Sequence, residues 1–485
     1  MSRRLTVHAA DEAAEISVLD GSFDRVACGI GQVDAELPDG LYVIRVRVGP
    51  TFSERLVALD QDTVELFDRQ EFPSPIPLAR TSTAQRRHVL AAEEIGAHPR
   101  DDLGQGGTVM VFVRDPSGGN AERTPSNPAT GLSLRRSDDP NGMHVDVAAR
   151  SDVRLEGDAC AGWSASVRPG PWILTLRQTD GTETERSIWV GQGNHVKIFL
   201  LRMEYALADG TSERVADLGR GAVVISPEPA FRTDDERTRL AELARYALTH
   251  DRRVLSERML GQILAEKFDD AMLGLIGAHL LVRDRPGDRA SLDIVLGNLT
   301  RILGRDNPDL QALALRAGSR PLPRQGLRHP PMLRAGWDAL VETSVRVPDV
   351  IVEGSPAATV ASRVLPGEPW LTWDAGSAEA DRAKVLTGIL DDYLTSRVNR
   401  AASRTAPAPA SRSSPSPSRR TRSRIASRRL DRDDARPAGA ERTTVPIPMK
   451  SSLALSLPDE EREELVRALG VPSGILSELL SKLSN

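Results

Sequence analysis

The feature that most constrains the fold is a short phrase that occurs twice, about 130 residues apart. In the first copy a Pro-Asp-Gly turn at residues 38–40 precedes a run in which every second residue is apolar: Tyr42, Ile44 and Val46 lie on one face, and Arg45 and Arg47 lie on the other. A period of two is typical of a strand with one buried face. A second strand is predicted over residues 54–59, so the phrase indicates a β-hairpin.

The second copy repeats the turn, the aromatic residue and the strand in register. Residues 168–177 align with residues 38–47, and Trp172 takes the place of Tyr42. The strands that follow, residues 53–59 and 184–190, align as well. We interpret the repeat as two related β-sandwich units; chance similarity between two hairpins is the alternative.

This phrase resembles the small sandwich modules of the carboxypeptidase-regulatory-like and PEGA type, in which a Pro/Gly turn precedes an aromatic residue and an alternating strand. The resemblance covers about 60 residues in each half of the repeat. Such modules usually bind or space other groups without catalytic residues. The resemblance therefore implies an accessory role, and it supplies no site residue to carry over.

After residue 225 the apolar period becomes helical. Thr233 and Glu236 form a capping box for the first of five predicted helices. The third, over residues 271–282, is apolar nearly all round and is expected to be central. Asp288 is placed to cap the fourth, and Asn307-Pro308 opens the fifth. Short connections predict an α-bundle or a solenoid-like array.

The order of these parts resembles a family of uncharacterised bacterial multi-domain proteins. The resemblance spans most of residues 10–375 and includes two distinctive phrases, at residues 267–281 and 329–337. It supports the architecture, and it implies no reaction, ligand or active site.

Charge is distributed unevenly along the chain. Residues 401–443 hold eleven arginines against four acidic residues, whereas the net charge of the chain is −5, so the remainder carries −12. Residues 401–445 have almost no large apolar side chains and are expected to be disordered, because they bury too little surface to offset the entropy of ordering. Two short helices are predicted after this linker.

The predicted fold class is multi-domain α+β. Its parts are a β-sandwich-like unit (1–80), a helical connector (81–107), a second β-sandwich-like unit (108–205), an α-helical array (206–318), a mixed α domain (319–400), the linker (401–445) and a C-terminal helix-turn-helix interaction module (446–485).

Several classes of protein lack support in the sequence. No motif for a nucleotide, a structural metal or another cofactor occurs. Only two cysteines are present, Cys28 and Cys160, which favours a reducing, cytoplasmic setting over a disulfide framework. We expect no signal peptide, and the longest apolar stretch is too short to span a bilayer.

Candidate catalytic groups are few. Asp269 and Asp270 are adjacent carboxylates of the kind used in acid/base work, but at a helix junction such residues more often cap the helix. We interpret His279 as a hydrogen-bonded core residue of the apolar helix. His329 precedes Pro330-Pro331, and we interpret it as a loop residue, with a catalytic role as the alternative.

We expect a non-enzymatic adaptor or scaffold that binds other proteins through its body and its C-terminal module. The last helix has an apolar stripe that suits docking into a partner's groove; it consists of Ile475, Leu476, Leu479, Leu480 and Leu483. No small-molecule substrate is identified.

Two alternatives stay open. One is a hydrolase-like enzyme with a site around His329 or around Asp269 and Asp270. The other is binding of nucleic acid or another anionic surface by the linker, although no aromatic residue is present there to stack on bases. The linker arginines concerned are Arg419, Arg420, Arg422, Arg424, Arg428 and Arg429.

Overall fold

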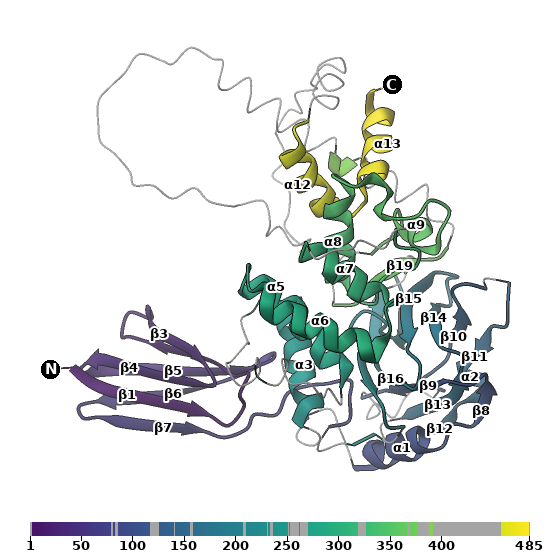
Figure 1. Cartoon of the computed structure of the whole chain (residues 1–485). Coiled ribbons are helices and arrows are strands. Elements are labelled where there is room, and N and C mark those ends of the chain that lie inside the picture. The colour runs from purple at the N-terminus through teal and green to yellow at the C-terminus, as the bar shows by residue number, and fades with distance from the viewer. Residues whose placement is uncertain are drawn as a thin grey trace, which may run out of the picture. The chain divides into compact units, whose positions relative to one another are not determined.

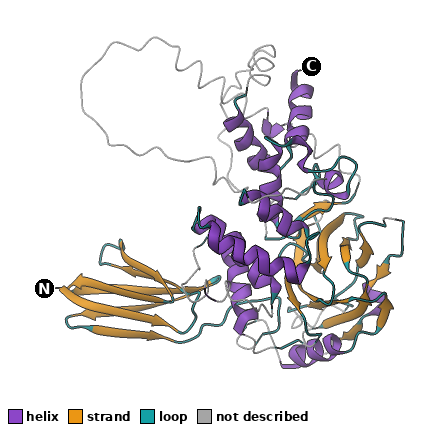
Figure 2. Ribbon diagram, viewed as in Figure 1, coloured by secondary structure: helices purple, strands orange, loops and turns teal. Residues whose placement is uncertain are grey.

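The computed structural model divides the chain into two compact units. Unit 1 comprises residues 1–340 and 349–376, and unit 2 comprises residues 341–348 and 377–485. The residues described are 2–78, 81–82, 86–116, 126–139, 141–155, 159–206, 210–229, 231–232, 236–250, 252, 261, 270–318, 326–365, 369–376, 386, 388–390 and 457–484. The whole is a mixed α+β protein, as the sequence predicts (Figures 1 and 2).

Unit 1 begins with a β-sandwich of seven strands. They are β1 (Ser2–Ala9), β2 (Glu15–Leu19), β3 (Arg25–Ile30), β4 (Gln32–Pro38), β5 (Gly40–Val48), β6 (Thr51–Leu59) and β7 (Thr63–Phe67). One sheet has the order β3-β2-β5-β6 and the other β4-β1-β7. Leu5, Ile16 and Ile44 are buried between them, so the predicted alternation does place one face of β5 in the core.

A second sandwich follows. Its strands are β8 (Asp101–Leu103), β9 (Gly107–Arg114), β10 (Leu132–Arg136), β11 (Val145–Asp146), β12 (Asp152–Arg154), β13 (Cys160–Val167), β14 (Gly170–Arg177), β15 (Glu183–Val190), β16 (His195–Ala206), β17 (Ser212–Ala216) and β18 (Ala222–Ser226). One sheet has the order β12-β13-β9-β16-β17, with β8 beside β13 and β18 beside β16. The other has the order β11-β10-β14-β15 and gains a strand from far along the chain, β19 (Thr372–Asp374).

The two predicted hairpins share a specific hydrogen bond. In β5–β6 the Tyr42 hydroxyl donates to the Pro38 carbonyl at 2.8 Å, and in β14–β15 the Trp172 indole donates to the Arg168 carbonyl at 3.0 Å. Each aromatic residue therefore ties down the carbonyl four residues before it, across the Pro/Gly turn. The two hairpins therefore match in register and in this contact.

The outer face of the larger sheet of the second sandwich is covered by α1 (Arg86–Ala97). Ala91, Ala92 and Ile95 of this helix pack with Phe112 and Phe199 of the sheet in a separate apolar cluster. The segment predicted as a helical connector is thus part of the second sandwich. A single turn, α2 (Val147–Arg150), follows β11.

Helices follow the second sandwich, and three of them begin where the sequence predicts. The helices are α3 (Glu236–Thr249), α5 (Ala271–Asp284), α6 (Arg289–Leu303) and α7 (Pro308–Arg316). Asp288 caps α6 by accepting from Ser291 N, and Asn307 caps α7 by accepting from Leu310 N. Residues 271–281 of α5 are buried, in agreement with its predicted central place. Thr233 and most of the predicted second helix lie outside the described residues.

A buried ion pair ties the first sandwich to α3. Arg239 donates to the Asp11 carboxylate at 2.7 Å, and both side chains are almost completely buried. Its guanidinium also lies over the Phe72 ring, 4.7 Å from the ring centre. A buried charge is stable only when it is paired and hydrogen-bonded, so Arg239 and Asp11 depend on each other.

Residues 319–400, predicted as one mixed helical domain, are divided between the two units. The structure shows α8 (Arg334–Ser344), the 3₁₀ turn η1 (Pro348–Val350), α9 (Pro356–Val360) and β19. The fully buried Asp309 carboxylate of α7 accepts from Met332 N at 2.9 Å and from Leu333 N at 2.8 Å. These bonds fix the start of the segment that returns to the second sandwich.

In unit 2 the described residues 457–484 form α12 (Asp459–Leu469) and α13 (Ser473–Ser484). Gly470 ends α12 in the left-handed conformation, as the sequence predicts. Ser473 contacts Ser344: its backbone N donates to the Ser344 hydroxyl and its hydroxyl donates to the Ser344 carbonyl. None of the described helices is long and apolar enough to cross a bilayer.

His279 differs from its predicted environment. It is fully buried in α5, but neither ring nitrogen has a hydrogen-bond partner among the described residues. Burial lowers its pKa from 6.5 to about 3. The folded-state pKa of His279 is below the unfolded-state value, so the neutral side chain costs the fold little stability above pH 6.5. The free energy of unfolding then decreases as the pH falls from 6.5 towards 3.

We therefore predict that His279→Leu makes stability less sensitive to acid. Between pH 7 and pH 5 the wild-type histidine should cost about 2 kcal/mol of unfolding free energy, and the variant should lose this part of the pH dependence. Urea unfolding at the two pH values measures the effect, with His98→Leu at an exposed position as the control. Equal pH dependence in wild type and His279→Leu would contradict the assignment.

Candidate functional site

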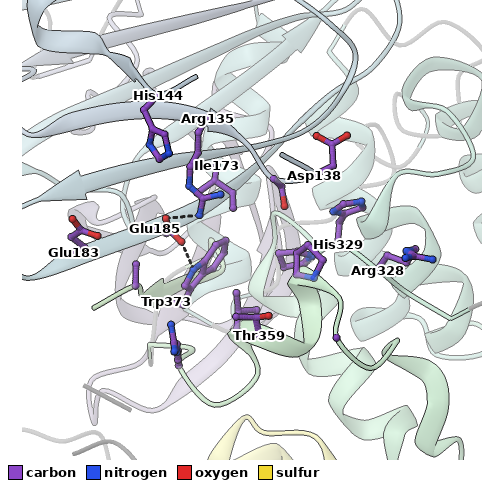
Figure 3. Close-up of a pocket in the computed structure, with 17 residues that line it drawn as sticks. Arg135, Asp138, His144, Ile173, Glu183, Glu185, Arg328, His329, Thr359 and Trp373 are labelled. Atoms are coloured by element: carbon purple, nitrogen blue, oxygen red, sulfur yellow. Dashed lines mark hydrogen bonds and ion pairs between the residues drawn. The ribbon is translucent and has the colours of Figure 1, made fainter. Parts of the chain in front are cut away.

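A pocket of about 690 Å³ lies on the polar face of the sheet β11-β10-β14-β15-β19, entirely within unit 1 (Figure 3). Strands β10, β14, β15 and β19 supply one side of it. The other side comes from residues 328–330 and from residues 354–363 around α9. This volume falls in the range of roughly 300–1,000 Å³ that is typical of sites for small molecules.

The polar character of this face follows from the alternation along β15. Arg186, Ile188 and Val190 point to the apolar interior of the sandwich, whereas Glu183 and Glu185 point to the pocket. An antiparallel sheet with polar residues on one face normally leaves that face in water. Here residues 328–330 and 354–363 cover that face. Polar side chains that the alternation predicts to be exposed to solvent are therefore enclosed.

Glu185 is the centre of the enclosed face. Its carboxylate accepts from Arg135 at 2.8 Å, from the Thr175 hydroxyl at 3.1 Å and from the Trp373 indole at 2.8 Å. The donors lie on β10, β14 and β19, so one buried side chain links four neighbouring strands. Figure 3 shows the contacts to Arg135 and Trp373 on one side of the pocket.

The other two acidic residues that line the pocket also have arginine partners. Arg136 donates to both oxygens of Asp138 at 2.7 and 2.5 Å and lowers the pKa of that carboxyl. Arg177 binds Glu183 at 2.5 Å. Arg328, in contrast, has no ion pair among the described residues. Among the described residues, no carboxylate of the pocket forms an ion pair with Arg328; the lining also includes Arg363.

His329 lies in the wall of the pocket beside Arg328, on the same side as Asp138 (Figure 3). Burial lowers its pKa below the ordinary value, with a smaller opposing influence of Asp138. Among the polar atoms of the wall, His329 Nδ1 and Ser137 Oγ are buried without a hydrogen-bond partner in the described part of the chain. Such atoms are few in native proteins and mark places where a further group or a water molecule is expected.

The structure assigns other roles to the remaining catalytic candidates. Asp270 caps α5 by accepting from Met272 N at 2.9 Å, which is the capping role that the sequence favours. Asp269 lies outside the described residues. Both cysteines are free thiols, and burial raises the pKa of Cys160. Within the described part of the chain, no group of three or more His, Cys, Asp or Glu residues could hold a metal ion.

A serine and a lysine also meet, a contact that sequence reasoning missed. Lys197 is buried on β16 and donates to the Ser226 hydroxyl at 2.6 Å; burial lowers its pKa to about 8. A lysine with such a pKa can activate a serine. Here, however, the Ser226 hydroxyl donates to the Glu228 carbonyl at 2.8 Å, and Lys197 donates to the same carbonyl. The pair is therefore arranged as a buried structural cluster.

The C-terminal apolar stripe is largely covered by the chain itself. Leu476, Leu479 and Leu480 are buried, and Ile475 is partly exposed; the side chain of Leu483 is not described. This differs from the stripe open to a separate partner that the sequence favours. Partner binding by these residues stays a prediction. Arg419 to Arg429 of the linker lie outside the described residues.

The first sandwich presents a different kind of surface. Seven of the fourteen large apolar side chains found exposed in the described residues belong to it. Leu41 and Leu56 point outwards from β5 and β6, and the register places them at the end of the sheet where the β2–β3 turn carries Phe23. We call Phe23, Leu41 and Leu56 the sandwich-end patch; the three are 71%, 59% and 67% exposed.

Phe23 has an unusual backbone. Its φ is 62°, the only positive value at a residue other than glycine in the described chain. A bulky side chain is strained in this region. Asp20 stabilises the turn by accepting from the backbone N of Ser22 and of Asp24. Strain of this kind is common at functional sites.

No family model and no curated protein matches the chain. The candidate sites therefore rest on geometry alone.

We predict that Glu185→Gln lowers the free energy of unfolding of unit 1 by about 3 kcal/mol, because Arg135 would keep a largely buried charge without a counter-ion. The pair Arg135→Met with Glu185→Gln should recover most of the loss, since no buried charge remains. Chemical denaturation of the three proteins measures the difference. A loss below about 0.5 kcal/mol for Glu185→Gln would contradict the central role of this contact.

For the C-terminal module we predict that Leu479→Asp unfolds α12 and α13, because a buried leucine is replaced by a charge. Hydrogen exchange of residues 459–484 measures this, and Ser477→Asp at an exposed position of α13 is the matched control. If Leu479→Asp leaves the protection of both helices unchanged, the stripe is not packed within the chain.

Proposed function

We propose that the chain is a non-enzymatic adaptor that binds another protein through the sandwich-end patch of its first β-sandwich. The observation that carries the proposal is the joint exposure of Phe23, Leu41 and Leu56 at one end of a well-packed sheet. Exposed apolar patches of this type are typical of interaction surfaces. Aromatic residues are enriched among the anchors of such interfaces.

Strand β6 adds a second reason. It is at the edge of its sheet, so the backbone groups of its outer side have no strand partner within the sheet. Proteins normally protect such edges, because they can pair with another chain. An extended segment of a partner could add to β6 and place apolar side chains on Leu56 and Leu41. Main-chain hydrogen bonds and the apolar patch would then act together.

A contact between the two sheets lies beside this surface. Arg55 of β6 bridges the two sheets at this side: it forms an ion pair with Glu65 of β7 and lies over the Phe67 ring, 4.5 Å from the ring centre. Arg55 therefore joins the two sheets at this edge within the chain itself. A partner bound there would meet a preformed surface, which lowers the entropic cost of association.

The experiment compares what co-purifies with the full-length chain and with two variants from cells that produce it naturally. Leu41→Glu with Leu56→Glu should lose proteins that the wild type retains in stoichiometric amounts, because the variant places charge in an apolar contact. Ile294→Glu, at an exposed apolar position of α6, should retain them. Equal recovery with all three proteins would contradict the proposal.

Phe23→Gly separates binding from folding. Glycine adopts the positive φ without strain, so we predict an increase in stability of about 1 kcal/mol together with weaker retention of the partner. Thermal unfolding and the same co-purification measure the two effects. Loss of both stability and binding would show that Phe23 is required for the fold instead.

A further inference from the structure

The pocket on the polar face of the second sandwich is a ready-formed site with a mixed lining. Ile173, Pro330, Val360 and the ring of Trp373 give it apolar walls, and each of these four residues is buried. Trp373 is fixed by its bond to Glu185, so this wall does not have to be ordered on binding. A carbon skeleton would therefore contact a rigid apolar surface.

The charges of the lining favour an anion. Glu185, Asp138 and Glu183 are each held by an arginine, namely Arg135, Arg136 and Arg177. These carboxylates are neutralised in the absence of a ligand, and they need no cation from it. Arg328 lies at the same pocket without an ion pair among the described residues. An arginine fork matches the two oxygens of a carboxylate or a phosphate.

His329 is the polar group next to Arg328 that can complete the recognition of such an anion. His329 follows it in the chain and lies on the same side of the pocket (Figure 3). Thr359 is exposed at the pocket, and its hydroxyl donates to the Ser355 carbonyl at 3.2 Å; the Ser137 hydroxyl is buried and has no partner among the described residues. A small number of polar groups placed beside apolar walls is typical of a site that orients its ligand.

We infer that this pocket binds a small organic oxyanion, with Arg328 as its counter-ion, His329 as a hydrogen-bonding neighbour and Trp373 as the surface under its carbon skeleton. The site is separate from the sandwich-end patch, and it does not depend on the adaptor role. It would make the second sandwich a ligand-binding domain within the same chain.

The test uses full-length protein and three matched probes: 1-naphthoate, 1-naphthyl phosphate and the neutral 1-naphthamide. Calorimetric titration should show binding of at least one anion to a single site, about tenfold tighter than the amide, as one charge-assisted hydrogen bond would give. The anion that binds with the higher affinity shows whether the site prefers a carboxylate or a phosphate.

Arg328→Gln should remove the preference for the anion. Its side chain is exposed, so the variant should fold normally, and an unchanged melting temperature checks this. Arg305→Gln, at an exposed arginine between α6 and α7, should keep the preference. The inference is overturned if no probe binds, if the amide binds as well as both anions, or if Arg328→Gln binds the anion as tightly as Arg305→Gln does.

Discussion

The arrangement of unit 1 depends most on the hydrogen bonds that the buried carboxylate of Glu185 accepts. A buried charge is tolerated only when its partners are complete, and here they come from three other strands. Arg135 and Thr175 belong to the sandwich, whereas Trp373 arrives from a segment almost 190 residues further along the chain. The same side chain thus completes the sheet and holds the returning segment over its polar face.

The returning segment contacts side chains on both faces of β15. Trp373 binds Glu185 on the pocket face, and Trp370 lies on the opposite face under Arg186, with its ring centre 3.8 Å from the guanidinium carbon. Arg186 is fully buried, which lowers its pKa to about 9, and it donates to the Leu218 carbonyl. Trp370 in turn donates to the Gly221 carbonyl at 2.6 Å. Two tryptophans three residues apart therefore fix β19 at the edge of the sheet, and the pocket is a consequence of that closure.

Local patterns in the sequence were sufficient for much of the fold. The period of two identified the β5–β6 and β14–β15 hairpins, and Asp288, Asn307 and Gly470 marked helix ends correctly because capping depends on neighbouring residues. Strand β19 has three residues, too few to show a period. The tryptophans beside it were visible in the sequence, but their partners on β15 are set by tertiary packing.

The pocket itself could not be predicted for the same reason. His329 was visible as an unusual histidine, yet its neighbours Arg135, Asp138 and Glu185 lie far away in the sequence. Glu183 and Glu185 have the pattern of an ordinary solvated strand face, and only the returning segment encloses them. The strain at Phe23 is equally hidden, because nothing in the residue type signals a positive φ.

Native-state hydrogen exchange of the backbone amides of residues 372–374 tests the central claim most directly. If the returning segment completes the sheet through Glu185 and Arg186, these amides exchange as slowly as those of β15, only when the sandwich as a whole opens. Exchange at the rate of an exposed loop, with β15 still protected, would contradict the account, because the pocket would then lack a fixed wall.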